Sequence, residues 1–426
     1  MNTSKTCEML TNFLLTNNCI PFLNQSSKTK YILKQLYNNI SDADKELQQM
    51  KSRPNFYNLK LGEIVEIDDI PKPKTFLEDG LDEMVEHHIN TNSYYKLTYF
   101  FNLLDNSFLK REVTIHFIIE KSDVDLDLDF EPNITRFNKY VDNILLSLLT
   151  LNKHTTNKCS NNLVYFLYFT SLKKRTSSTM DVLGRNHVNT GFTYTCPFNN
   201  AEIVIFRKEE WFKVLIHESF HNLNLDFSGM DNQQPCHEKM TALFNINSTV
   251  RLYETYTEFW AKILNILIFN YNLLDDKRDY ITFLKYADFL INYERIHCFF
   301  QMVKILKFNK LTYQDILSGS DKLKSYKEDS NVFAYYVITL ILLNNYPAFL
   351  LWCYDNNSHT QILQFNQTLE NKEKLCAFIE SNYNIPTLLD GVICSEKLLN
   401  KIKPTTSNKT GKYILTNLRL SLCEIE

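Results

Sequence analysis

The chain has 426 residues, of which 44% are hydrophobic and 22% are charged, and its formal net charge is -3. This composition excludes an intrinsically disordered chain, which lacks the apolar side chains for a core, and it shows no basic excess of the kind that nucleic-acid-binding proteins carry. We therefore expect a folded globular protein that does not bind nucleic acid.

Three features of the sequence bear on its location. Residues 1–23 have no basic start, no continuous apolar stretch and no small-residue cleavage site, so we expect no secretion by the usual signal peptide. The longest apolar run, residues 334–354, is interrupted by Asn344, Asn345 and Pro347, whereas a spanning helix needs about 20 continuous apolar residues. The ten cysteines show no C-x-x-C pair and no regular spacing. We expect a cytoplasmic protein with free thiols and no membrane span.

The first part of the chain, residues 1–92, is mostly polar and helical in pattern. Two stretches rich in β-branched and aromatic residues follow, at 111–121 and 161–172, and they flank an amphipathic segment that Asn133 can cap. This order predicts a strand, a helix and a strand.

The middle of the chain continues with two short strand patterns, at 187–196 and 201–207, joined by the turn residues PFNN, which predicts a β-hairpin. A helix over 208–223 follows at once, with acidic Glu209 and Glu210 in its first turn. A second strong helical pattern begins near Ser248.

The last part of the chain, from residue 276 onward, is helical in pattern and carries no chemical motif. We therefore predict an α+β protein with three parts: a mostly helical N-terminal region (1–92), a central core (93–275) and a helical C-terminal domain (276–426).

The helix over 208–223 carries the sequence His217-Glu218-x-x-His221, a pattern that the composition predicts roughly 0.01 times by chance. Side chains four residues apart lie on one face of a helix, so the two imidazoles can bind one ion, and imidazole is a good ligand for Zn²⁺. Glu218 is then placed to act as a general base toward a water at the metal. A catalytic zinc site has three protein ligands, so one ligand is missing.

The missing ligand is expected to be a carboxylate or histidine on a neighbouring element. The helix that begins near Ser248 offers Glu254 and Glu258, four residues apart on one face. One of them can bind the metal while the other accepts a hydrogen bond from a ligand histidine, as carboxylates around metal sites commonly do.

His217-Glu218-x-x-His221 followed 33 residues later by Glu254-x-x-x-Glu258 resembles the gluzincin group of zinc metallopeptidases, the thermolysin-like clan. The segment YETYTEFWAKIL is similar to the NEAISDIF element of that clan, although Tyr253 replaces the usual Asn and Glu258 replaces the usual Asp. The chain also resembles uncharacterised HExxH proteins of large DNA viruses, and its composition suggests an AT-rich genome. This second resemblance implies a viral protein in the host cytoplasm or in the virion.

The gluzincin resemblance, which covers residues 187–265, implies a zincin-like core and a Zn²⁺ cofactor bound by His217, His221 and Glu254. Glu258 would be the outer carboxylate, and Glu218 the catalytic base for hydrolysis of a protein or peptide substrate. It also implies that Asn189, Thr190, Gly191 and Phe192 lie on an edge strand that pairs with the extended substrate.

Several alternatives remain open from the sequence. The group that stabilises the oxyanion could be Tyr253, Tyr256, His187 or His297. A non-catalytic protein could keep the zincin fold as a virion or host-interaction component, in which case Glu218 would be dispensable. A helical protein with a chance motif would bind no metal.

Overall fold

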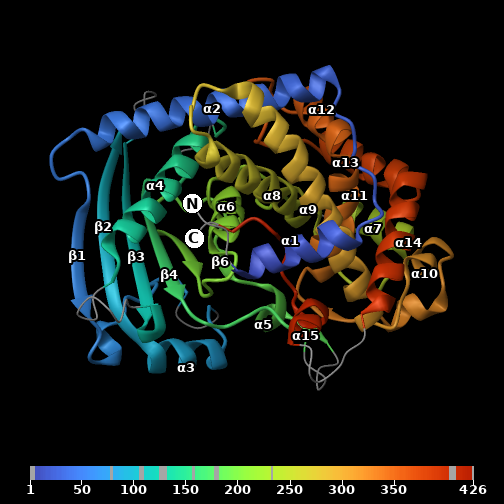
Figure 1. Cartoon of the computed structure of the whole chain (residues 1–426), viewed down its shortest axis with the longest axis horizontal. Coiled ribbons are helices and arrows are strands. Elements are labelled where there is room, and N and C mark those ends of the chain that lie inside the picture. The colour runs from blue at the N-terminus through green and yellow to red at the C-terminus, as the bar shows by residue number, and fades with distance from the viewer. Residues whose placement is uncertain are drawn as a thin grey trace. The chain divides into compact units, whose positions relative to one another are not determined.

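The structure is a computed structural model that describes residues 5–76, 80–104, 110–123, 132–155, 159–176, 182–231, 234–402 and 409–424. It combines many helices with a six-stranded mixed sheet (Figure 1), which confirms the predicted α+β class. The strands are β1 (Asn58–Glu63), β2 (Ser93–Leu104), β3 (Lys110–Glu120), β4 (Asn162–Phe169), β5 (Leu183–Gly184), β6 (Gly191–Thr193), β7 (Ala201–Ile205) and β8 (Glu328–Asp329). The α-helices are α1 (Lys5–Asn17), α2 (Ser27–Lys51), α3 (Glu83–Asn92), α4 (Ile134–Asn152), α5 (Arg185–Val188), α6 (Trp211–Asn222), α7 (Gln234–Phe244), α8 (Leu252–Leu273), α9 (Tyr280–Phe308), α10 (Tyr313–Leu317), α11 (Thr339–Asn344), α12 (Tyr346–Asn356), α13 (Leu369–Asn382), α14 (Pro386–Lys401) and α15 (Lys409–Thr416).

The chain divides into two compact units, each built from separate segments of the sequence. The helical unit contains residues 1–36, 174–188 and 226–426, and the sheet unit contains residues 37–173 and 189–225. The boundaries expected near residues 92 and 275 stay a prediction about the domains.

The sheet unit contains the six-stranded sheet, in the order β1-β2-β3-β4-β7-β6. The β3–β4 and β4–β7 pairs are parallel, and the β1–β2, β2–β3 and β6–β7 pairs are antiparallel. The predicted strand, helix and strand are confirmed as β3, α4 and β4, and Asn133 caps α4 by accepting a hydrogen bond from the Arg136 N–H. The predicted hairpin is confirmed as β6 and β7, although both strands are shorter than predicted and residues 185–188 form a helical turn.

Helices cover both faces of this sheet. On one face, Val85 and Ile89 of α3 belong to a buried cluster with Ile118 of β3 and Val204 of β7. On the other face, Tyr140 of α4 contacts the α6 side chain Trp211, with ring centroids 5.1 Å apart, and further aromatic contacts join both helices to the strands. Burial of each large apolar side chain contributes about 1.5–3 kcal/mol, so this packing fixes α6 against the sheet.

The helical unit is organised around α8, whose residues are nearly all buried from Leu252 to Tyr271. A helix that is apolar all round belongs inside a core, and the charged side chains on it then need buried partners.

No single helix among the described residues has the length and apolar character needed to cross a membrane. One pair of helices passes the same test together: α11, with the π-helical turn before it, and α12, which are bent by 90° relative to each other.

Four of the ten cysteines form disulfides, which corrects the expectation of free thiols at these four positions. Cys159 is bonded to Cys196 in the sheet unit, and Cys19 is bonded to Cys394 in the helical unit. The partners are 37 and 375 residues apart, so spacing along the chain gave no signal for either bond.

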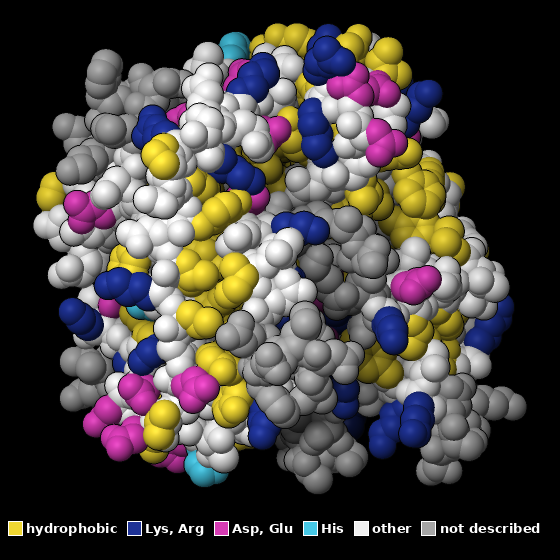
Figure 2. Space-filling view, turned by 60° about the vertical axis from the view of Figure 1, so that its left-hand side comes forward, with side chains coloured by type: hydrophobic (Ala, Val, Ile, Leu, Met, Phe, Trp, Pro, Cys, Tyr) yellow, Lys and Arg dark blue, Asp and Glu magenta, His cyan; other side chains and the backbone are white. Residues whose placement is uncertain are grey.

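The molecular face in Figure 2 carries basic and acidic side chains interspersed with hydrophobic ones.

Candidate metal centre

The helix α6 carries His217, Glu218 and His221, and all of its residues are buried. The helix begins at Trp211. Glu210, the residue before it, has a φ of 60°, which lies in the left-handed region, and it is the last residue of the connection from β7. Glu209 and Glu210 therefore precede the helix, and their predicted place in its first turn was wrong.

The C-terminal end of α6 is fixed by side-chain bonds within the sheet unit. The Asn222 amide donates to the Thr193 hydroxyl over 2.9 Å, and the Ser160 hydroxyl donates to the Asn222 amide oxygen over 2.5 Å. The Cys196 N–H donates to the His221 carbonyl, and the disulfide to Cys159 holds Cys196. These contacts anchor the last helical turn, which carries His221.

The two imidazoles lie side by side, as predicted from their spacing. Their side chains are buried, and the two Nε2 atoms are 3.2 Å apart. Two nitrogens bound to one tetrahedral zinc at about 2.0–2.1 Å lie roughly 3.3 Å apart, so the pair fits this ion without rearrangement. The same separation accommodates a hydrogen bond between the rings.

Glu254 on α8 completes a group of three. His217, His221 and Glu254 each offer one ligand atom, these atoms all lie within 4.8 Å of one another, and all three residues are buried. Two imidazoles and one carboxylate form a donor set that catalytic zinc sites use, so the group can hold a metal ion.

The Glu254 carboxylate is held by two donors that the sequence did not reveal. The Asn331 amide donates to Oε1 over 2.9 Å, and the Tyr335 hydroxyl donates to Oε2 over 3.0 Å. Both donors are about 80 residues further along the chain, in a segment without a recognisable motif.

Glu258, one turn after Glu254, belongs to a fully buried chain of charges. Its Oε1 lies 3.4 Å from the Lys262 ammonium, which lies 3.2 Å from Glu294 Oε1. The other oxygen of Glu294 accepts the Leu422 N–H over 2.9 Å. Lys262 thus joins α8 to α9, and Glu294 joins α9 to the C-terminal segment. The predicted support of a ligand histidine by Glu258 stays a prediction.

The strand β6 contains two of the four predicted substrate-binding residues, Gly191 and Phe192, and Asn189 and Thr190 precede it. Phe206 donates its N–H to the Thr190 carbonyl, so by alternation the main-chain groups of Phe192 also point toward β7 and those of Gly191 point away. β6 is the terminal strand of the described sheet order, so Gly191 presents main-chain groups at an outer edge. Substrate pairing at this edge stays a prediction.

Gly191 is also closely packed. A Cβ added at this position would lie 2.7 Å from the Val204 carbonyl oxygen and 2.6 Å from the Ile205 side chain. The approach of β6 to β7 therefore requires glycine.

The four candidates for the oxyanion-stabilising group differ in burial and in hydrogen bonding. The Tyr256 hydroxyl is buried and donates to the Leu363 carbonyl over 2.9 Å, and Asn357 donates to the same hydroxyl. His297 is buried and bonded to Gln301, and His187 accepts the Gly184 N–H. Tyr253 is only partly buried, and burial together with the charge of adjacent Glu254 raises its pKa to about 12, so its phenol keeps its proton at neutral pH.

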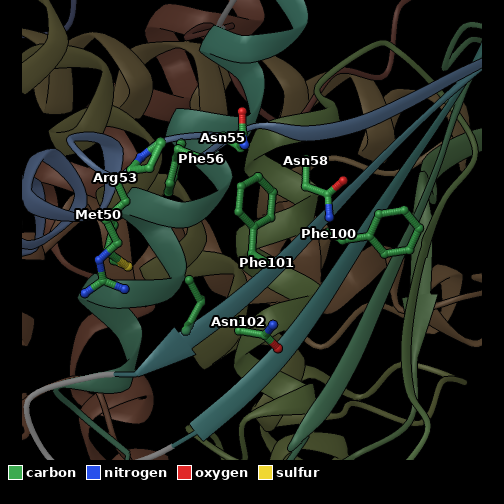
Figure 3. Close-up of a pocket in the computed structure, with 10 residues that line it drawn as sticks. Met50, Arg53, Asn55, Phe56, Asn58, Phe100, Phe101 and Asn102 are labelled. Carbon is green, nitrogen blue, oxygen red and sulfur yellow. The ribbon is translucent and has the colours of Figure 1, made fainter.

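The lining of a pocket in the sheet unit differs chemically from the candidate metal centre (Figure 3). It has a volume of about 240 Å³, and its lining includes Phe56 and Phe101 with three asparagine side chains. Arg53 is the charged residue in this lining, which contains no carboxylate, histidine or cysteine. The pocket therefore lacks the groups for metal binding or general-base catalysis.

Comparison of the chain with protein-family models, with curated proteins and with solved structures gave no match. The chemical interpretation of the site therefore depends on its residues and their geometry.

Proposed function

We propose that the protein is a zinc-dependent metallopeptidase with a zincin-like core. The observation that carries this proposal is the buried group of His217, His221 and Glu254, with Glu218 next to the first histidine on the same helix. His217 and His221 would bind the metal through Nε2, and Glu254 through one carboxylate oxygen. Bound zinc supplies a Lewis acid that polarises a substrate carbonyl and lowers the pKa of a coordinated water to about 7.

Glu218 performs the proton transfers in this proposal. Its carboxylate would take a proton from the attacking water as the new C–O bond forms, and would then give that proton to the amine nitrogen as the peptide C–N bond breaks. The main-chain groups of Gly191 would pair with the extended substrate, as a free strand edge does with a peptide.

The proposal predicts metal-dependent cleavage of peptides. A diverse peptide mixture is incubated with zinc-loaded protein, and products are identified by mass spectrometry. We expect cleavage that stops when 1,10-phenanthroline removes the metal and returns when zinc is restored. Cleavage that continues unchanged in metal-free protein would refute the proposed chemistry.

A further inference from the structure

The contacts around Glu254 extend the site beyond the predicted residues. Each carboxylate oxygen has two acceptor positions, and each oxygen of Glu254 uses one for a donor from the segment 331–335. These two donors restrict rotation of the carboxylate.

The segment that supplies these donors has an unusual backbone. Residues Ala334–Ile338 form a π-helical turn, a rare conformation that often occurs at functional sites. The Ala334 carbonyl accepts the Thr339 N–H, the Thr339 hydroxyl over 2.9 Å and the Thr255 hydroxyl over 3.4 Å. Since Thr255 directly follows Glu254, this turn is attached to α8 beside the carboxylate.

We propose that Asn331 and Tyr335 are positioning residues that hold the Glu254 carboxylate ready for the metal. This inference rests on the proposed function. Donors to ligand carboxylates orient the ligand, and their loss typically costs 10–100-fold in metal affinity or activity. If Asn331 and Tyr335 only supplied hydrogen bonds to a buried carboxylate, their loss would not change metal binding. As positioning residues they also affect the metal affinity and the environment of the ion.

The test compares Tyr335→Phe and Asn331→Ala with the control Tyr336→Phe. Tyr336 neighbours Tyr335, is also buried, and donates its hydroxyl to the Leu418 carbonyl over 2.5 Å. Tyr335→Phe retains the packed ring, and Asn331 is only partly buried just before the helix, so Asn331→Ala provides a second variant if the first does not fold. Circular dichroism checks the fold of each variant.

Zinc affinity is measured by competition with a chromophoric chelator, and the Co²⁺-substituted proteins are compared by their visible absorption spectra. We expect the affinity to fall about 10–100-fold in both test variants, with altered Co²⁺ spectra, and to be unchanged in Tyr336→Phe. If folded Tyr335→Phe and Asn331→Ala bind zinc as tightly as the unmodified protein, the positioning role is wrong and the metal site stands. If the unmodified protein itself binds no zinc, both the positioning role and the proposed function are wrong.

Discussion

The variant Glu218→Gln is expected to keep its zinc and to lose its peptidase activity. Glutamine has nearly the same shape as glutamate but cannot accept the proton of the attacking water. General acid–base catalysis contributes about 10²–10⁴-fold, so we expect kcat to fall by at least about 100-fold. Because Glu218 lies on α6 between the two histidines, its replacement by an isosteric amide should leave their geometry unchanged.

The control for this variant is Glu238→Gln, which makes the same chemical change at an exposed position on α7. Its activity should match that of the unmodified protein, and both proteins should carry the same amount of zinc. Full activity in Glu218→Gln would contradict the assigned base. It would also be the result expected if a contaminating protease produced the measured cleavage.

The variants His217→Ala, His221→Ala and Glu254→Ala are each expected to lose the metal. Each removes one of three ligands and leaves two, which does not complete the three-ligand site that catalytic zinc uses. Loss of a supporting residue costs 10–100-fold, so loss of a direct ligand should weaken zinc binding by more than about 100-fold. Zinc content after dialysis against a chelator measures this effect.

The control for these variants is His87→Ala, which removes an exposed imidazole on α3. It should keep its zinc. If Glu254→Ala also retained its zinc while the two histidine variants lost theirs, Glu254 would not be the third ligand. Retention of zinc in both histidine variants would contradict the site itself.

Local patterns in the sequence predicted the elements that depend on local preferences. Three elements could each be predicted from a few neighbouring residues. They are the strands β3 and β4, from their β-branched and aromatic residues, the start of α4, from its Asn133 cap, and the hairpin of β6 and β7, from its turn. The helical spacing of His217 and His221 likewise predicted that the imidazoles would meet, and their Nε2 atoms lie 3.2 Å apart.

Other features depend on contacts between distant segments. Strand β1 was missed because residues 1–92 read as mostly polar and helical, and no element was predicted for β2, which follows that region. β1 pairs with β2, and β2 pairs with β3. α7 was missed because no helix was predicted between residues 223 and 248. The bond between Cys19 and Cys394 and the contacts of Asn331 and Tyr335 with Glu254 join residues far apart in the chain. Only tertiary packing creates such pairs, so no spacing rule could predict them.

The most direct test is the zinc content of the unmodified protein. After purification in zinc-replete buffer and extensive dialysis, elemental analysis should find about one zinc per chain, because two imidazoles and one carboxylate make a single three-ligand site. Well under half an equivalent of zinc would contradict the metal centre and, with it, the proposed peptidase.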